Sequence, residues 1–403
     1  MRERVVVTGL GIVSPIGNDI PTFEANLKKG VVGEGPITHF PAENFPVKRA
    51  YEAKNFISPL SAKRLDPFIQ FAISSSDQAL DDAGLDLTRW DPYDIGIVMS
   101  SSKGGLTTYC QHIENFKKNR RALLAARVYS SFIPNIASQW IARKRKIRGP
   151  AVCYVTACAT GTYSIAEASE MIRRGEVKVC IAGASDASIC ELPLAGYYQM
   201  GVYAKGPMLP FKKQRTGFQV GEGAGCLILE SLEQAQKRGA KIYGEIGAHS
   251  YQNDAHNMVG FNSQGSALRR TIEILLAREK MEPGDVSYIN LHGTATQEGD
   301  VYEVEQLRSA FGESLNRIPM SATKSMTGHM LGASGVVEII ATLLGIKNGF
   351  LPPTAGAGEI DPSFQDLDLV PNEARKGNIS NALTYSLGFG GHLVALMLKK
   401  YEN

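Results

Sequence analysis

Short apolar runs alternate with helix-patterned segments along this 403-residue chain, and this alternation limits the folds that the chain can adopt. Uninterrupted apolar runs are typical of strands that are buried on both faces. Two intervening segments, 68–83 and 162–174, end just before a glycine, which commonly terminates a helix. We therefore predict an α/β fold with helices on both faces of the sheet. The expected strands are Val5–Val7, Ile95–Met99, Val177–Ala182, Cys226–Leu229, Tyr288–Leu291 and Leu393–Leu398.

The length of the chain exceeds that of most single domains, so we expect either one large domain or two closely packed ones. No linker rich in proline, glycine or serine divides the sequence. Any two halves should therefore share an interface.

The cysteines, histidines and N-terminus indicate a cytoplasmic protein without a membrane segment. The six cysteines form no C-x-x-C pair and lie mostly in apolar surroundings, which is typical of reduced, buried thiols. None of the seven histidines has ligand spacing, so no metal site is expected. The N-terminus lacks the apolar core of a signal peptide, and no apolar run of about 18 residues predicts a bilayer-spanning helix.

The glycine-rich turn after the first expected strand does not predict nucleotide binding. Gly9 and Gly11 begin a dinucleotide-like pattern, but Ser14 stands where its third glycine would be. The net charge of +3 is also too small to indicate a nucleic acid partner.

Cys158 lies in a turn of small residues between the apolar run 152–155 and a helix-patterned segment. The free amides and positive dipole end of a helix N-terminus favour a thiolate over a thiol. A single cysteine at such a turn is usually structural, so this position alone assigns no catalytic role.

A catalytic role for Cys158 is favoured by four motifs that follow one another along the chain. They are T-A-C-A-T-G around Cys158, H-G-T-A-T-x-x-G-D from His292, K-S-M-T-G-H ending at His329, and G-F-G-G from Gly388. Together they resemble the decarboxylating β-ketoacyl-acyl carrier protein synthases, or ketosynthases. The likeness covers essentially the full chain. It is closest to the synthase I/II group, which uses one cysteine and two histidines.

The resemblance implies a thiolase-like fold of five layers, α-β-α-β-α, built from two similar halves. Residues 1–244 would form the N-terminal half with the nucleophile Cys158. Residues 245–403 would form the C-terminal half with His292 and His329.

The implied reaction is a decarboxylative Claisen condensation in fatty-acid or type II polyketide or polyene synthesis. Cys158 would take the acyl chain, and His292 and His329 would stabilise the enolate formed when malonyl-acyl carrier protein loses CO2. The backbone N–H groups of Cys158 and Phe389 would hold the oxyanion. Phe389, flanked by Gly388 and Gly390, would also act as a movable gate, although a plain tight turn explains these glycines equally well.

Other site residues follow from burial and from the resemblance. Glu338 is surrounded by apolar residues, so it needs a cationic partner, and Lys324 is the natural candidate. Asp300 and Glu303 are expected either to support the site or simply to form an acidic first helical turn. The resemblance requires no cofactor, but some members hold a monovalent cation, which here would involve Asn290 and Glu338.

The expected partner is acyl carrier protein bearing acyl and malonyl groups. Basic side chains that would dock this acidic protein, or simply form a solvated face, are Lys63, Arg64, Arg120, Arg121 and Arg127. Tyr109 is expected in the acyl pocket. A homodimer is the default for the family, and a heterodimer with a ketosynthase-like subunit is the alternative.

Two other functions remain open. A non-catalytic, chain-length-determining partner subunit of a heterodimeric ketosynthase would typically lack the nucleophile, so Cys158 argues against it. A cysteine hydrolase would give His329 and its K-S-M-T-G-H motif no purpose.

Overall fold

The computed structural model describes residues 3–60, 62, 64–119 and 128–402. Its centre is a ten-stranded sheet in the order β10-β9-β13-β14-β8-β1-β7-β6-β4-β5. The strands are β1 Val5–Val13, β4 Ile95–Ser100, β5 Ala151–Val152, β6 Val179–Asp186, β7 Gly223–Ser231, β8 Gly244–Asn253, β9 Tyr288–Asn290, β10 Met320–Ser321, β13 Asn381–Gly388 and β14 His392–Lys399.

The sheet repeats one pattern twice along the chain. The first five strands lie in the order β5-β4-β6-β7-β1, and the last five lie in the matching order β10-β9-β13-β14-β8. In each set the first two pairings are parallel and the last two are antiparallel. The two sets join where β1 pairs with β8 over Val5–Val7. This repetition, with the layering below, confirms a five-layer fold of two similar halves.

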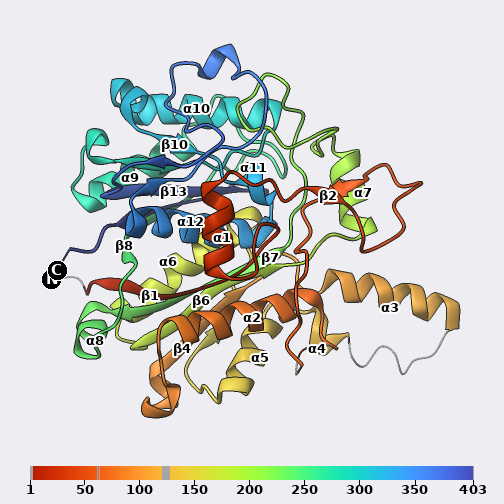
Figure 1. Cartoon of the computed structure of the whole chain (residues 1–403), viewed down its shortest axis with the longest axis vertical. Coiled ribbons are helices and arrows are strands. Elements are labelled where there is room, and N and C mark those ends of the chain that lie inside the picture. The colour runs from red at the N-terminus through yellow and green to blue at the C-terminus, as the bar shows by residue number, and fades with distance from the viewer. Residues whose placement is uncertain (1–2, 61, 63, 120–127, 403) are drawn as a thin grey trace.

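Helices cover both outer faces and fill the middle (Figure 1). Outer helices α2 Pro67–Asp82 and α5 Ile136–Arg145 pack on the first five strands, and α9 Ala267–Glu279, with α10 Gln297–Phe311 beside it, covers the last five. The central helices α6 Thr160–Arg173 and α12 Ser334–Asn348 pack against each other between the two sets. Cys158 lies just before α6 and His329 lies just before α12, so both residues lie near the central layer, where the two halves meet.

Smaller elements connect these layers. The remaining α-helices are α1 Ile20–Lys28, α3 Leu106–Asn119, α4 Tyr129–Phe132, α7 Glu191–Gln199, α8 Leu232–Lys237 and α11 Lys324–Thr327. The 3-10 helices that matter for the site are η4 Ala157–Ala159 and η7 Leu331–Ala333, and the others are η1 Leu87–Arg89, η2 Pro92–Asp94, η5 Pro283–Asp285, η6 Gly312–Arg317 and η8 Pro362–Phe364. Two small sheets pair β2 Gly35–Pro36 with β3 Arg49–Ala50, and β11 Phe350–Leu351 with β12 Arg375–Lys376.

The helix at the centre of the fold is unusually apolar. The helical stretch Leu331–Asn348 has a mean hydropathy of 1.3 and is long and apolar enough to cross a membrane. However, 89% of it is buried inside the protein, which identifies it as a core helix. It is apolar because α12 lies between the two halves.

Gly9 and Gly11 serve packing in this fold. A Cβ atom built on Gly9 would lie 2.2 Å from the carbonyl oxygen of Ala79, and one on Gly11 would lie 1.9 Å from that of Ser75. These glycines let β1 approach α2 closely, which accounts for the glycine pattern without a nucleotide.

Candidate active site

Cys158 occupies the turn that the sequence predicted, between β5 and α6. It lies in η4, which leads directly into α6, and its side chain is buried. The preceding residue, Ala157, has a φ of 50°, in the left-handed region that non-glycine residues rarely adopt. Such a strained position persists only where the surrounding structure enforces it, which is common at functional sites.

The electrostatic environment of Cys158 corrects one expectation. The sequence predicted that the helix mouth would favour a thiolate, but burial raises the pKa of this thiol. The charges of Lys103 and Lys324 and a hydrogen bond from the backbone N–H of Phe389 lower it in opposition. Desolvation prevails because Cys158 is enclosed by both halves, which the local sequence could not show.

The His292 turn is organised by a buried carboxylate. Glu303, on α10, accepts hydrogen bonds from the backbone N–H groups of His292 at 2.6 Å and Gly293 at 2.9 Å. It also accepts one from the hydroxyl of Tyr385 at 2.6 Å. Glu303 therefore supports the site, whereas Tyr385 was missed because nothing in the sequence links strand β13 to this turn.

Asp300 fixes the next part of the same turn. Its carboxylate accepts hydrogen bonds from the N–H of Ala295 at 3.0 Å and from that of Phe211 at 2.8 Å. Burial raises the pKa of Asp300 to about 7. Asp300 and Glu303 thus do more than form an acidic first turn, since both hold backbone amides around His292.

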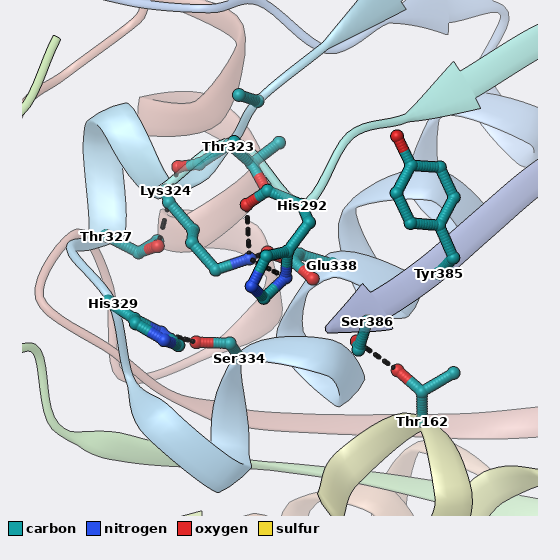
Figure 2. A network of polar contacts seen from close by, with 12 residues as sticks. Thr162, His292, Thr323, Lys324, Thr327, His329, Ser334, Glu338, Tyr385 and Ser386 are labelled. Atoms are coloured by element: carbon teal, nitrogen blue, oxygen red, sulfur yellow. Dashed lines mark hydrogen bonds and ion pairs between the residues drawn. The ribbon is translucent and has the colours of Figure 1, made fainter. Parts of the chain in front are cut away.

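Lys324 joins His292 to Glu338, as Figure 2 shows. Its ammonium donates to the His292 carbonyl oxygen at 2.7 Å and to Glu338, and lies 3.3 Å from Nδ1 of the His292 ring. All three side chains are buried. The predicted Lys324–Glu338 pair is present, and it leaves Nε2 of His292 free to act in the site.

His329 is oriented from its other side. Its Nδ1 lies 3.0 Å from the hydroxyl of Ser334, at the start of α12 (Figure 2). Among the described residues, Nε2 of this ring has no hydrogen-bond partner. The ring also makes an edge contact with Phe218, with centroids 5.0 Å apart. Ser334 and Phe218 carry no sequence signal of this role.

Both imidazoles are held neutral. Burial, followed by the positive charge of Lys324, lowers the pKa of His292 and His329 well below the usual histidine value. Their ring centroids are 5.8 Å apart, with planes 89° to each other. A neutral imidazole can donate a hydrogen bond through its one N–H group without being an imidazolium that gives up a proton. This pair therefore suits an oxygen that becomes negatively charged.

The cysteine and histidine segments meet at close backbone contacts. Helix η4 packs against η7, which begins two residues after His329, and against α12. A Cβ atom on Gly161 would lie 2.7 Å from the Gly332 carbonyl oxygen, so only glycine permits this approach. The same Lys324 charge acts on Cys158, His292 and His329.

The G-F-G-G turn closes over the cysteine. A Cβ atom on Gly388 would lie 2.6 Å from the Thr156 carbonyl oxygen, just before Cys158. Gly390 has a φ of 83°, and its N–H donates to the Met258 carbonyl oxygen at 2.9 Å. Together with the Phe389 N–H directed at the sulfur, this placement fits an oxyanion hole at Cys158.

Other predicted residues lie elsewhere or are not described. Tyr109, on α3, stacks on Phe132 with ring centroids 4.7 Å apart, and the described contacts do not join it to Cys158. Arg64 is exposed. The other docking candidates lie outside the described residues: Lys63, Arg120, Arg121 and Arg127.

Comparison with known proteins decides the family. The Beta-ketoacyl synthase, N-terminal domain, matches residues 2–235, and the Beta-ketoacyl synthase, C-terminal domain, matches residues 243–357. The chain belongs to the β-ketoacyl synthase family. It is 40% identical, over 100% of its length and 99% of the relative's, to 3-oxoacyl-[acyl-carrier-protein] synthase 2 of Staphylococcus aureus (strain COL).

Solved ketosynthase structures resemble this chain over its full length. The ishigamide ketosynthase/chain length factor superposes with a TM-score of 0.92 at 31% identity, covering 100% of both chains. A ketosynthase in complex with its type II polyketide synthase acyl-carrier protein, bound to the hexaketide, superposes with a TM-score of 0.93 at 30% identity and also covers both chains fully. The fold that brings the motifs together is therefore the β-ketoacyl synthase fold.

Proposed function

We propose that this β-ketoacyl synthase joins a Cys158-bound acyl chain to malonyl-acyl carrier protein, giving 3-oxoacyl-acyl carrier protein and CO2. The observation that supports this best is the pair of neutral imidazoles, His292 and His329, held nearly perpendicular beside the cysteine turn. A hydrolase needs one imidazole to activate a nucleophile. Two imidazoles with both Nδ1 atoms engaged suit an oxyanion instead.

The first half-reaction transfers the acyl chain. The sulfur of Cys158 attacks the carrier thioester carbonyl, the new carbon–sulfur bond forms, and the carrier thiol departs with the proton. The Phe389 N–H and the amide of Cys158 would hold the carbonyl oxygen while it is negatively charged.

The second half-reaction begins with malonyl. Nε2 of His292 and of His329 would donate hydrogen bonds to the thioester oxygen while CO2 leaves and an enolate forms. Each well-placed donor of this kind typically contributes about 3 kcal/mol. The enolate carbon then attacks the acyl carbonyl on Cys158, and the cysteine leaves as the new carbon–carbon bond closes.

Acyl carrier protein is the proposed partner, in line with the complex in which a similar ketosynthase was solved. Exposed Arg64 would contribute to an electrostatic dock for this acidic protein. We also propose that the chain pairs with a second copy or with a ketosynthase-like subunit. Strand β5 forms one edge of the sheet, and an edge strand is where a partner chain can pair.

We propose that a monovalent cation binds near buried polar atoms that have no protein partner among the described residues. Both side-chain polar atoms of Asn290 and one carboxylate oxygen of Glu338 are buried without a hydrogen-bond partner among the described residues. The hydroxyl of Thr384 is also buried without a hydrogen-bond partner among the described residues, and Thr384 pairs with Asn290 in the sheet. Asn290 and Glu338 would hold the cation, which would supply positive charge that orders the turn before His292.

Product analysis tests the proposed activity. Purified protein is incubated with malonyl-acyl carrier protein and a series of acyl carriers, and the products are weighed by mass spectrometry. We expect 3-oxoacyl products two carbons longer than the acyl donor, with one CO2 released per product. Release of free fatty acid without chain extension would refute the proposal and favour a hydrolase.

A further inference from the structure

Lys103 is a charged residue beside the active cysteine that the family motifs do not include. It follows strand β4, whose two neighbours β5 and β6 run parallel to it. The carboxyl ends of these three strands therefore meet at one edge of the sheet. Cys158 follows β5, Lys103 follows β4, and Asp186 ends β6, so the three side chains come from adjacent strand ends.

The backbone around Lys103 is fixed by specific contacts. Asp186 accepts hydrogen bonds from the Ser101 hydroxyl at 2.8 Å, the Ser102 N–H at 3.2 Å and the Gly332 N–H at 2.7 Å. One buried carboxylate thus ties the segment before Lys103 to the segment after His329. On the other side of Lys103, a Cβ atom on Gly104 would lie 2.2 Å from the Phe132 carbonyl oxygen. The loop that carries Lys103 is therefore closely packed against the segment around Phe132.

The Lys103 ammonium forms no carboxylate ion pair among the described residues, although the side chain is partly buried. Its Nζ lies 5.7 Å from the centroid of the Tyr197 ring, a cation–π contact. The oxygens of Asp186, the carboxylate nearest in the sheet, already accept three other donors. A cation withdrawn from water without a paired anion is costly unless the site offers it a negative charge.

The charged groups that face Cys158 come from several elements. Lys103, after β4, and Lys324, from α11, favour the thiolate, whereas Asp186, from β6, opposes it. Tyr197, from α7, contacts Lys103. His292 and His329 are neutral, and Lys324 is already bound to Glu338 and to the His292 carbonyl. The charge of Asp186 acts on Lys103 as well as on Cys158, but no described carboxylate forms an ion pair with the Lys103 ammonium, which leaves its charge available to Cys158.

We propose that the Lys103 ammonium stabilises the Cys158 thiolate and thereby sets the rate of acyl transfer. Lys103 is a positioning residue in this account, because it acts through the sulfur and makes no bond to substrate. This inference rests on the proposed function for its acyl-transfer step.

The stabilisation applies to one balanced step. Cys158 loses its proton, its sulfur bonds to the thioester carbonyl carbon, and the bond from that carbon to the carrier sulfur breaks. The carrier sulfur leaves as a thiolate and takes up the proton, so no further reactant is required. Negative charge sits on Cys158 before the attack and returns when condensation releases it, and the charge of Lys103 acts on the sulfur in both stages.

The test measures alkylation of Cys158 by iodoacetamide as a function of pH, read by mass spectrometry of the Cys158 peptide. Lys103→Met and Lys103→Gln remove the charge, and Lys103→Arg retains it. We expect both neutral variants to shift the alkylation profile to higher pH, with alkylation at pH 7 slower by about tenfold, the change in thiolate fraction for a shift of one pKa unit. Lys103→Arg should restore most of the rate.

Lys241 provides the matched control. It also lies over a tyrosine ring, 4.5 Å from the centroid of Tyr243, but it pairs with Asp82 and is not among the charges acting on Cys158. Lys241→Met should leave the profile unchanged. Alkylation profiles of Lys103→Met and Lys103→Gln that coincide with the wild-type profile would overturn the proposal.

The outcome separates this inference from the proposed function, because alkylation requires neither carrier protein nor condensation. A shifted profile in a protein that forms no 3-oxoacyl product would refute the function alone. If Lys103→Met does not fold, the comparison of Lys103→Gln with Lys103→Arg decides. Equal profiles of those two variants would then contradict the role of charge.

Discussion

The rings of His292 and His329 face each other edge to face, with centroids 5.8 Å apart and planes at 89°. Each ring is anchored through Nδ1, one by Lys324 and the other by Ser334. Since both pKa values are held low by burial, neither ring is protonated at neutral pH. When Nδ1 of each ring accepts its hydrogen bond, Nε2 carries the proton and is the nitrogen that can donate. Two such donors on neighbouring neutral rings meet the requirement of an enolate site.

Replacing Cys158 separates the two half-reactions. In Cys158→Ala the carbon–carbon bond cannot form because no acyl-enzyme exists, but some decarboxylation of malonyl carrier should persist because both histidines remain. Condensation and CO2 release are measured in parallel, with Cys153→Ala as the control for a neighbouring thiol outside the proposed chemistry. Undiminished condensation by Cys158→Ala would remove the nucleophile assignment.

Removing either imidazole should reverse that pattern. His292→Ala and His329→Ala should each slow decarboxylation by about 10²–10³-fold, the usual cost of one oxyanion donor. Acylation of Cys158 should continue in both variants. Exposed His256 serves as the control, and its replacement by alanine should change neither rate. An equal loss of acylation in the two site variants would point to a different role for the histidines.

The buried pair of Lys324 and Glu338 predicts a strong effect on stability. Lys324→Met leaves the carboxylate of Glu338 buried without its partner, which typically destabilises a protein by about 3–5 kcal/mol. Replacing both residues, as Lys324→Met with Glu338→Leu, should recover much of that loss but not the activity, because the His292 anchor is gone. Urea unfolding of the three proteins measures this, and a double variant as unstable as the single one would contradict it.

His39 predicts a pH-dependent contribution to stability. Burial opposes protonation of its ring, but the hydrogen bond and charge of Glu222, 2.7 Å away, and the charge of Glu52 raise the pKa of His39 to about 8. A pKa above the unfolded value of about 6.5 stabilises the fold fully below pH 6.5, and this stability is lost as the pH rises through 8. Thermal unfolding between pH 6 and 9 should show a smaller decline in His39→Gln than in the wild type.

The sequence predicted the strands that are apolar throughout but not those that carry polar residues inward. Strands β8 and β13 were missed although both lie inside the sheet, away from its edge strands. In β13, Thr384, Tyr385 and Ser386 are buried polar residues. Tyr385 and Ser386 are satisfied by Glu303 and Thr162, which come from distant segments. Apolar patterning cannot reveal a strand whose partners are functional groups elsewhere in the fold.

The sequence motifs predicted the candidate catalytic residues, whereas the charges and burial that shift their pKa values are known only from the fold. The pairing of Lys324 with Glu338 followed from one argument, that a carboxylate on an apolar helix needs a cation. The raised pKa of Cys158 and the position of Lys103 depend on three adjacent strand ends and on enclosure by both halves. No local pattern encodes that meeting.

The most direct test follows the mass of the peptide that contains Cys158 during one catalytic cycle. Incubation with acyl carrier protein should add the acyl mass to Cys158, and malonyl carrier protein added afterwards should remove it as 3-oxoacyl product appears at the same rate. An acyl group on a different residue, or product formation while the Cys158 adduct persists, would contradict the account.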